Sequence, residues 1–200
     1  MDTSDVRFCG SALTLRDAPR DPVPHIAVAG RSNVGKSSFL NWLLRRRVAR
    51  VAKAPGRTRT LNFYLVGSRF YLVDLPGYGF AKVGVELRRE WGRALSRYLA
   101  EEQRLAGVVA LVDVRHGATK LDLELQELLL AAEVERLVVL TKGDKVGRGK
   151  RRAMEARLQR ELALPTPPLT VTVNAPDGRR EILGIIDDMA GRWRRRPRRE

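Results

Sequence analysis

The segment "AGRSNVGKSSFLNWL" (29–43) constrains the fold more than any other part of this chain. It places the pattern G-x-x-x-x-G-K-S between an apolar run typical of a strand and an apolar run typical of a helix. Glycines in such a loop let backbone N–H groups converge on phosphate oxygens, and the start of the following helix adds free N–H groups and a positive dipole end. The segment therefore predicts a strand, a phosphate-binding loop and a helix in succession.

Two side chains of this loop are suited to a polyphosphate and its metal ion. Lys36 is expected to reach the outer phosphates, and the Ser37 hydroxyl is expected to bind Mg²⁺. The alternative is a glycine-rich turn with a serine that caps the helix, which the four fixed residues in their proper context disfavour. The loop alone does not distinguish ATP from GTP, or a kinase from a hydrolase.

Apolar runs alternate with helical patterns along the rest of the chain, which predicts an α/β fold with helices on both faces of a mostly parallel sheet. The runs "LNFYLV" and "FYLVDL" flank Gly67-Ser68 and predict one antiparallel hairpin strand at the edge of a six-stranded sheet. The chain ends, 1–20 and 194–200, are expected to lie loose. The expected strands are 25–30, 61–66, 70–75, 107–113, 136–141 and 169–173, and the expected helices are 37–47, 86–104, 120–133, 147–163 and 178–194.

Charge and composition narrow the compartment and the partner. The 38 basic and 23 acidic residues give a net charge of +15, which favours a polyanionic partner, nucleic acid first and an anionic membrane second. A general drift toward arginine is the alternative explanation. The single cysteine excludes an internal disulfide, and the longest apolar runs are too short to span a bilayer. A polar N-terminus without a signal segment completes the expectation of a soluble cytoplasmic protein.

Two further stretches are suited to the metal ion and the terminal phosphate. In "VDLPGYG" (73–79), Asp74 can hold Mg²⁺ directly or through water, and the Gly77 N–H can meet a terminal phosphate. The basic stretch "KAPGRTRTLNF" (53–63) has the composition of a mobile loop. Thr58 and Thr60 both qualify from their chemistry to close over Mg²⁺ when a third phosphate is present.

The stretch "TKGDK" (141–145) follows an apolar strand and is suited to a guanine base. The Asp144 carboxylate can accept hydrogen bonds from the ring N–H and the exocyclic amine of guanine, a donor pair that adenine lacks. The aliphatic part of Lys142 can pack on the base. The loop "VNAPDG" (173–178) stands where backbone donors could also reach the base.

The stretches "GRSNVGKSSFLN", "PGRTRTLNFY", "DLPGYGFAKV", "DVRH" and "TKGDK" together resemble the EngB (YihA/YsxC) family of bacterial ribosome-biogenesis GTP-binding proteins, which are TRAFAC-class P-loop GTPases. The resemblance covers about residues 23–180. It implies the three-layer P-loop GTPase fold, with an N-terminal extension at 1–22, a G domain at 23–193 and a basic tail at 194–200.

Carried over by position, the resemblance implies roles for individual residues. Lys36, Thr58 and Gly77 would act on the third phosphate. Mg²⁺ would be held by Ser37 and Thr58, with Asp74 acting through water. The implied set for GTP or GDP is Gly30, Arg31, Ser32, Asn33, Val34, Gly35, Lys36, Ser37, Gly56, Arg57, Thr58, Arg59, Thr60, Asp74, Leu75, Pro76, Gly77, Thr141, Lys142, Gly143, Asp144, Val173, Asn174 and Ala175.

The resemblance also implies a function. It predicts a monomeric, Mg²⁺-dependent GTPase that acts in assembly of the large ribosomal subunit, contacts rRNA, lacks DNA specificity and is linked to cell division and septation. Two alternatives stay open: a nucleotide-stabilised scaffold on RNA with negligible turnover, and a P-loop ATPase. The chain departs from the family pattern at Arg59, usually glutamine, and at Asn174-Ala175, usually Ser-Ser or Ser-Ala.

Two residues bear on the rate of hydrolysis. Many GTPases position the attacking water with a glutamine directly after D-x-x-G, and this chain has Tyr78 there, which predicts slow intrinsic hydrolysis. Asn33 resembles the asparagine with which related GTPases coordinate K⁺, so K⁺ near Asn33 could stimulate turnover; the alternative is that Asn33 only braces the loop. The arginine-rich tail "GRWRRRPRRE" suits RNA, with a solvated chain end as its alternative.

Overall fold

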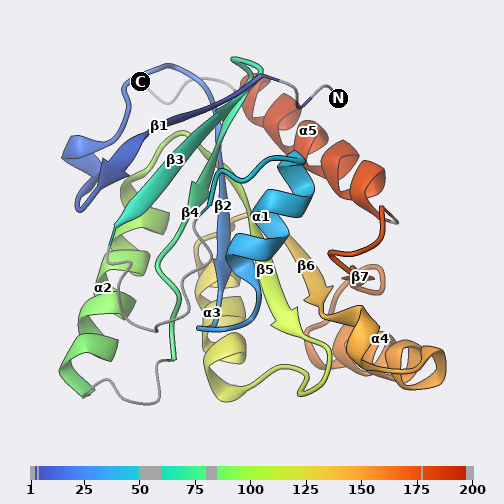
Figure 1. Cartoon of the computed structure of the whole chain (residues 1–200). Helices are drawn as coiled ribbons and strands as arrows, with labels where there is room; N and C mark the ends of the chain where they lie inside the picture. Colours follow the sequence, from blue (N-terminus) through green and yellow to red (C-terminus); the bar gives the residue numbers. More distant parts are fainter. Residues whose placement is uncertain (1–2, 4, 50–59, 80–84, 177, 197–200) are drawn as a thin grey trace.

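The computed structural model describes residues 3, 5–49, 60–79, 85–176 and 178–196, and within them one sheet lies between two layers of helices (Figure 1). The strands are β1 (Val6–Ala12), β2 (His25–Gly30), β3 (Leu61–Val66), β4 (Phe70–Asp74), β5 (Leu105–Asp113), β6 (Arg136–Thr141) and β7 (Leu169–Thr170). The helices are α1 (Lys36–Leu44), α2 (Val85–Glu101), α3 (Lys120–Ala131), α4 (Arg148–Glu161) and α5 (Arg179–Arg194), with short 3₁₀ turns η1 (Leu15–Asp17) and η2 (Gly143–Lys145).

The sheet has the strand order β1-β3-β4-β2-β5-β6-β7. All neighbours from β4 to β7 pair in parallel, whereas β3 pairs antiparallel with both β4 and β1. The predicted class, a three-layer and mostly parallel sheet with one antiparallel hairpin strand, is confirmed. The sheet in the described residues contains seven strands, one more than the six expected.

The additional strand is β1, so the expectation that residues 1–20 lie loose is wrong for this segment. β1 pairs with β3 along its whole length, and its register shifts between Phe8 and Gly10, where Gly10 has a φ of +121°. Only Val6 and Ala12 are buried in this strand, and Phe8 is exposed. The bulge and the exposed edge position remove the apolar alternation by which a strand is recognised in a sequence.

The expected hairpin of β3 and β4 is confirmed, and its turn has a simple chemical cause. Gly67 and Ser68 both have a φ of +52°, and the Arg69 N–H donates to the Val66 carbonyl over 2.9 Å. Positive φ at both central residues defines the type I′ turn, whose twist matches that of the two strands it joins.

At the other end of the chain, α5 continues to Arg194, and the Trp193 indole donates to the Gln103 carbonyl over 2.8 Å. The domain boundaries 1–22, 23–193 and 194–200 stay predictions. None of the described helices combines the length and the apolar character that a membrane crossing requires.

Successive residues of the central strands supply two separate apolar cores. Ala27 and Ala29 of β2 face the layer of α2, α3 and α4, whereas Ile26 and Val28 face α1 and α5. Because both faces are covered, β2, β4 and β5 are buried at every position, as parallel strands in a doubly covered sheet must be. The loops at the strand ends are therefore mounted on a rigid support.

A histidine is enclosed at the start of β2, away from those loops. His25 is fully buried, and its ring lies edge-on to Phe63 and Tyr71 at centroid distances of 5.6 and 5.5 Å. Its Nδ1 atom lies 3.4 Å from the Tyr98 hydroxyl and 3.6 Å from a Glu102 carboxylate oxygen. Burial lowers the pKa of His25 to about 4, because Glu102 only partly offsets the loss of solvent.

This burial predicts a loss of stability in mild acid. The neutral imidazole is favoured in the folded state, while the unfolded chain takes up a proton below the ordinary pKa of 6.5. Burial of His25 therefore leaves the free energy of unfolding unchanged above pH 6.5 and lowers it as the pH falls toward 4, by up to about 3 kcal/mol. Urea unfolding of the chain and of its His25→Phe variant between these pH values should show a flatter pH dependence in the variant.

The chain has a second histidine, the exposed His116, which serves as the matched control. His116→Gln should keep the full pH dependence of the original chain. Equal acid sensitivity in the original chain and in His25→Phe would mean that His25 is not the group responsible.

Candidate nucleotide-binding site

Most of the predicted site residues that the structure describes lie on loops at the carboxyl ends of β2, β4 and β6, which together with β5 end at the lower edge of the sheet in Figure 1. These strands are parallel neighbours, so their ends meet at one edge. Loops at the carboxyl ends of parallel strands are where open α/β sheets bind ligands. The structure thus brings together segments that are more than a hundred residues apart in the sequence.

The phosphate loop, residues 30–37, joins β2 to α1. Gly35 occupies the cap position of α1 with a φ of +102°, and no side chain caps the helix within the described residues. The first N–H groups of α1 therefore face the loop. A Cβ atom on Gly30 would lie 2.8 Å from Val34 Cγ1 and 3.1 Å from Leu111 Cβ, so glycine is required there for packing. The expected backbone cradle for an anion is compatible with this geometry.

The loop after β4 lies directly against the phosphate loop. The Ser32 N–H donates to the Tyr78 carbonyl over 2.7 Å, and Arg31 forms a parallel bridge with Tyr78. A Cβ atom on Gly77 would lie 3.4 Å from the Ser32 nitrogen. The Gly77 backbone thus lies beside the phosphate loop.

A buried ion pair joins the same two loops. The Lys36 ammonium donates to an Asp74 carboxylate oxygen, and both side chains are almost entirely shielded from solvent. A carboxylate that already holds a cation is suited to exchange it for a metal ion when phosphates attract the lysine. Asp74 and the nearby hydroxyl of Ser37 are oxygen ligands of the kind that Mg²⁺ prefers, so the residues present fit this metal.

Tyr78, at the position where many GTPases have glutamine, serves the packing of α3. Its side chain is 4% exposed, and its hydroxyl donates to Asp122 over 2.8 Å. Burial, with the adjacent carboxylate, raises the pKa of Tyr78 far above its ordinary value. Asp122 also accepts from the Thr119 N–H and hydroxyl, closing the first turn of α3.

The TKGD loop, residues 141–144, is fastened to the other side of the phosphate loop. The Thr141 hydroxyl donates to the Val34 carbonyl over 2.7 Å, and the Lys142 ammonium donates to the Asn33 carbonyl over 2.6 Å. Lys142 has a φ of +61°. These contacts hold the Lys142 side chain against the phosphate loop.

Asp113, at the end of β5, holds this lysine in place and was not predicted as a site residue. Its carboxylate accepts from Lys142 over 2.8 Å and from Arg115 over 2.7 Å. Burial raises the pKa of Asp113, yet the hydrogen bonds from Arg115 and Lys142 more than offset burial and keep the pKa well below its usual range. Asp113 pairs with Thr141 in the sheet register. Its position at the carboxyl end of a central strand was the sequence signal that could have identified it as a site residue.

Asp144 presents its carboxylate at the surface beside this network. It lies in η2 and forms an ion pair with Lys145 at 2.9 Å, a contact that lowers the pKa of Asp144. The Gly143 N–H donates to the Val171 carbonyl over 3.0 Å, which places the 171–175 segment next to the TKGD loop. A Cβ atom on Gly143 would meet Thr170 and Thr172 at 2.9 Å.

The segment Val173, Asn174 and Ala175 follows β7, which ends at Thr170 and is therefore shorter than the strand expected over 169–173. The Trp42 indole of α1 donates to the Ala175 carbonyl over 2.6 Å and anchors this segment. Gly56, Arg57, Thr58 and Arg59 lie outside the described residues. Thr60 is described at the start of β3, where its hydroxyl lies 3.5 Å from Asn62 Oδ1.

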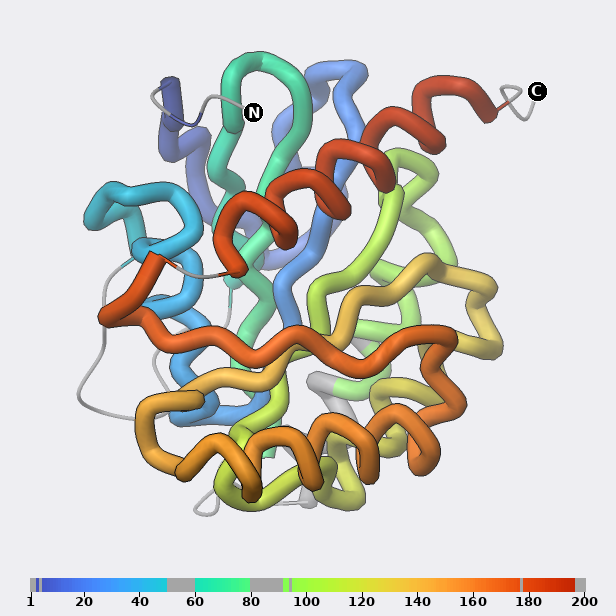
Figure 2. Tube along the Cα trace, turned by 90° about the vertical axis from the view of Figure 1, so that its right-hand side faces the viewer, coloured from blue at the N-terminus to red at the C-terminus, as the bar shows by residue number. Residues whose placement is uncertain are grey.

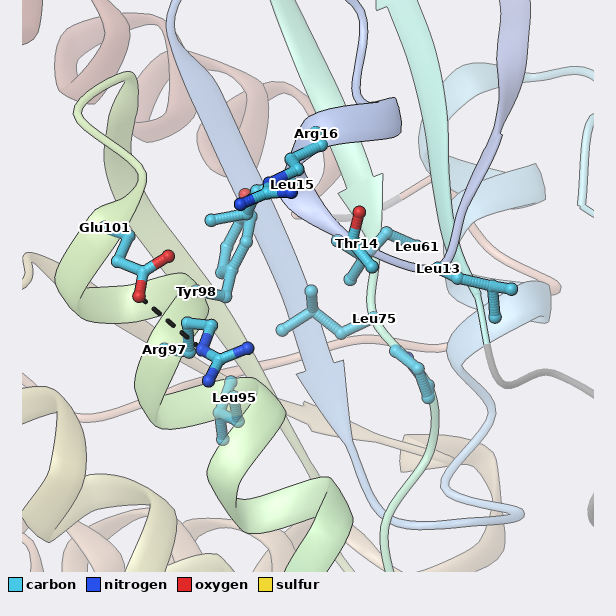
Figure 3. Close-up of a pocket in the computed structure, with 11 residues that line it drawn as sticks. Leu13, Thr14, Leu15, Arg16, Leu61, Leu75, Leu95, Arg97, Tyr98 and Glu101 are labelled. Atoms are coloured by element: carbon cyan, nitrogen blue, oxygen red, sulfur yellow. Dashed lines mark ion pairs between the residues drawn. The ribbon is translucent and has the colours of Figure 1, made fainter.

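A cavity of about 520 Å³ lies elsewhere, between η1 and α2 (Figure 3). It is lined largely by apolar side chains, among them Leu15, Leu61 and Leu95, and of the site residues that the structure describes it shares only Leu75 and Pro76.

Comparison with known proteins identifies related chains. A family model described as a 50S ribosome-binding GTPase matches residues 25–142. A protein from Pelotomaculum thermopropionicum described as a probable GTP-binding protein EngB is 43% identical over 197 residues, covering 96% of this chain and 97% of the relative.

Two solved structures share the fold. A crystal structure of a probable GTP-binding protein EngB has a TM-score of 0.70 at 21% identity and covers 84% of this chain and 99% of its own. Era in complex with MgGDPNP and nucleotides 1506–1542 of 16S ribosomal RNA has a TM-score of 0.66 at 21% identity and covers 89% of this chain and 58% of its own.

The Asp113 network predicts a variant that weakens nucleotide binding without selecting between nucleotides. Asp113→Asn removes the charge that holds Lys142, so the affinities for GTP and GDP should fall together, by about tenfold, because the contact lies far from the third phosphate. Titration with fluorescent GTP and GDP analogues measures both affinities. Arg115→Gln, which removes only the exposed partner of Asp113, is the control and should have a smaller effect. A loss confined to GTP would contradict this role.

Proposed function

Because this chain belongs to the EngB family of GTP-binding proteins and is a GTPase, we propose that it hydrolyses GTP slowly as a switch in assembly of the large ribosomal subunit. The observation that carries the proposal is the joining of the phosphate loop to both the Asp74–Gly77 loop and the TKGD loop. The matching family of 50S ribosome-binding GTPases, the net charge of +15 and the rRNA fragment bound by Era support a ribosomal RNA partner.

In this proposal the phosphate loop, Gly30 to Ser37, holds the phosphates of GTP with its backbone N–H groups. Lys36 leaves Asp74 and turns to the outer phosphates, and the Gly77 N–H meets the third phosphate. Ser37 and Thr58, with Asp74 acting through water, would hold Mg²⁺. When bound, Mg²⁺ neutralises charge on the phosphate oxygens. The Era complex, which contains MgGDPNP, supports this assignment by analogy of fold.

The base is assigned to Asp144 and Lys142. Asp144 accepts from the two donors of guanine, and the aliphatic part of Lys142, held between Asn33 and Asp113, packs on the ring. Thr141, Gly143 and the Val173–Ala175 segment complete the base side. Gly56, Arg57, Thr58, Arg59 and Thr60 are proposed to close over the third phosphate and to relax after hydrolysis.

Slow hydrolysis follows from the environment of Tyr78. Its hydroxyl is bonded to Asp122 in the packing of α3, so it offers no amide to orient water. Many GTPases use an arginine to stabilise the negative charge that develops on the phosphates. We assign this role to K⁺ held near Asn33, whose side chain is exposed while its carbonyl is fixed by Lys142. We further propose that the protein is a cytoplasmic monomer, and that it is linked to cell division and septation, as its resemblance to the EngB family implies.

The base assignment predicts a change of nucleotide preference. Asp144→Asn replaces one of the two acceptor oxygens with an amide donor, so GTP affinity should fall about 100-fold or more while xanthosine triphosphate, which has a carbonyl in place of the amine, gains. Competition against a fluorescent GTP analogue measures both affinities. ATP is not expected to displace the analogue from either the original chain or the variant. Lys145→Gln removes only the ion-pair partner of Asp144 and should keep the preference for guanine. Unchanged GTP preference in Asp144→Asn would disprove the assignment.

The proposed switch predicts particle binding that depends on the nucleotide. The protein should sediment with large-subunit precursors in GTP more than in GDP or without nucleotide, because GTP orders the loops that face the particle. Phosphate release should be slow alone, faster with particles, and faster in K⁺ than in matched Na⁺. Binding that is equal in all nucleotide states, with no phosphate release, would instead support the scaffold alternative. Equal turnover in K⁺ and Na⁺ would remove K⁺ from the proposal.

A further inference from the structure

Five arginines gather where the end of α1 meets the start of α5. Figure 2 shows the turn after α1, in cyan, beside the first turn of α5, in red. We call this set the arginine cluster: Arg45, Arg46, Arg47, Arg179 and Arg180. Four of its members are exposed, and Arg179 is half-buried.

The cluster lacks the compensation that other arginines of this protein have. Arg69, Arg104, Arg115 and Arg192 each form an ion pair with a carboxylate. Within the described part of the chain, no member of the arginine cluster has an ion pair. Positive charge is therefore concentrated at this surface, where it can attract a polyanion.

Helix stability explains only part of this arrangement. Arginines after the last turn of α1 face the negative end of its dipole, which is favourable. Arg179 and Arg180, however, are the first two residues of α5 and add to the positive end of that helix, where positive charge is unfavourable. Glu181 in the same turn offsets only one of these two charges, so a net positive charge remains at the start of this helix. The cluster thus has more positive charge than its helices require.

The backbone that carries the cluster is held in place. The Asn41 side chain donates to the Ala49 carbonyl and accepts from the Ala49 N–H, both over 2.9 Å. Arg45 takes a φ of +51°, which ends the helix and directs the next residues into the turn. The arginine side chains are therefore displayed from a fixed turn, so less backbone entropy is lost when they bind.

Arg179 is anchored from the opposite side. Its guanidinium donates to the Leu43 carbonyl over 2.8 Å and to the Thr3 hydroxyl over 2.6 Å. Burial, and then the positive charge of Arg45, lowers the pKa of Arg179. The two guanidinium groups are thus near enough to repel each other, and an anion between them would relieve that repulsion.

A hollow of about 210 Å³ opens between these two arginines. It is lined by Trp42, Arg45, Arg179 and the 173–176 segment. The hollow combines guanidinium groups, an indole and exposed backbone, which can bind phosphate, a base or ribose, and hydroxyl groups respectively. Among the described residues, Val173 is the only large exposed apolar side chain in the lining, whereas membrane-binding surfaces present several.

From these observations we propose that the arginine cluster is a docking surface for the phosphate backbone of RNA. This inference rests on the proposed function for its partner and names the surface that the partner contacts. The surface lies beside the Val173–Ala175 segment, because the Trp42 indole donates to the Ala175 carbonyl. The bound RNA would thus lie next to the nucleotide site.

The test neutralises three exposed members of the cluster whose side chains form no hydrogen bond or ion pair with the described residues. The variant is Arg46→Gln, Arg47→Gln and Arg180→Gln in the full chain. The matched control is Arg148→Gln, Lys150→Gln and Arg152→Gln on α4, which removes the same charge from another exposed surface. The probes are protein-free large-subunit rRNA, large-subunit precursor particles and vesicles of phosphatidylglycerol, each titrated over a series of salt concentrations.

The cluster variant should bind protein-free rRNA at least tenfold more weakly at about 0.1 M salt, and its salt slope should fall by about two, while the α4 control loses less. GTP affinity should be unchanged in both variants. Equal loss in both variants, or no loss in the cluster variant, would overturn the inference. A loss seen only with vesicles would assign the cluster to lipid and would also overturn it.

The two proposals fail separately in this experiment. If the original chain binds protein-free rRNA through the cluster but ignores ribosomal particles, the docking surface stands and the proposed function fails. If the original chain binds particles and the cluster variant binds them and rRNA equally well, the proposed function stands and the docking surface fails. Binding of neither RNA nor particles by the original chain would refute both.

Discussion

The arrangement of the site depends on the hydrogen bonds that hold the phosphate loop between its two neighbours. On one side Ser32 bonds to the Tyr78 backbone, and on the other Thr141 and Lys142 bond to carbonyls of the loop. These bonds involve backbone groups that would otherwise be left unsatisfied near the buried strand ends. The loop is therefore positioned before any ligand binds, which reduces the cost of ordering it.

Charged groups at this edge of the sheet form two lysine–carboxylate ion pairs. Lys36 neutralises the buried Asp74, and Lys142 neutralises Asp113. Burial makes each carboxylate depend on its cation, because an unpaired buried charge is strongly unfavourable. The Lys36 pair is suited to open when phosphates and a metal ion arrive, whereas the Lys142 pair is held further by Arg115 and keeps its geometry. The Lys36 pair thus suits the proposed phosphate side of the site, where contacts would change on binding, and the Lys142 pair suits the proposed base side, where they would not.

The net charge of +15 is unevenly compensated over the described surface. Arg69 and Arg192 near the far end of the sheet are paired with Asp187 and Glu135, so their charge contributes mostly to local structure. The arginine cluster has no such partner among the described residues. Total charge therefore indicated a polyanionic partner, while the pairing pattern indicates which surface that partner would contact.

The sequence by itself determined the order of nearly all helices and strands, and it located the segments of the site, because glycine patterns and apolar runs act locally. It did not reveal β1, whose pairing with β3 depends on an edge that exists only in the folded sheet. It also did not reveal the role of Asp113, the bond between Tyr78 and Asp122, or the meeting of Arg45 with Arg179. Each of these joins residues far apart in the chain. Only the tertiary structure could decide them, because the strand order, and not the spacing in sequence, sets which strand ends and helix ends become neighbours.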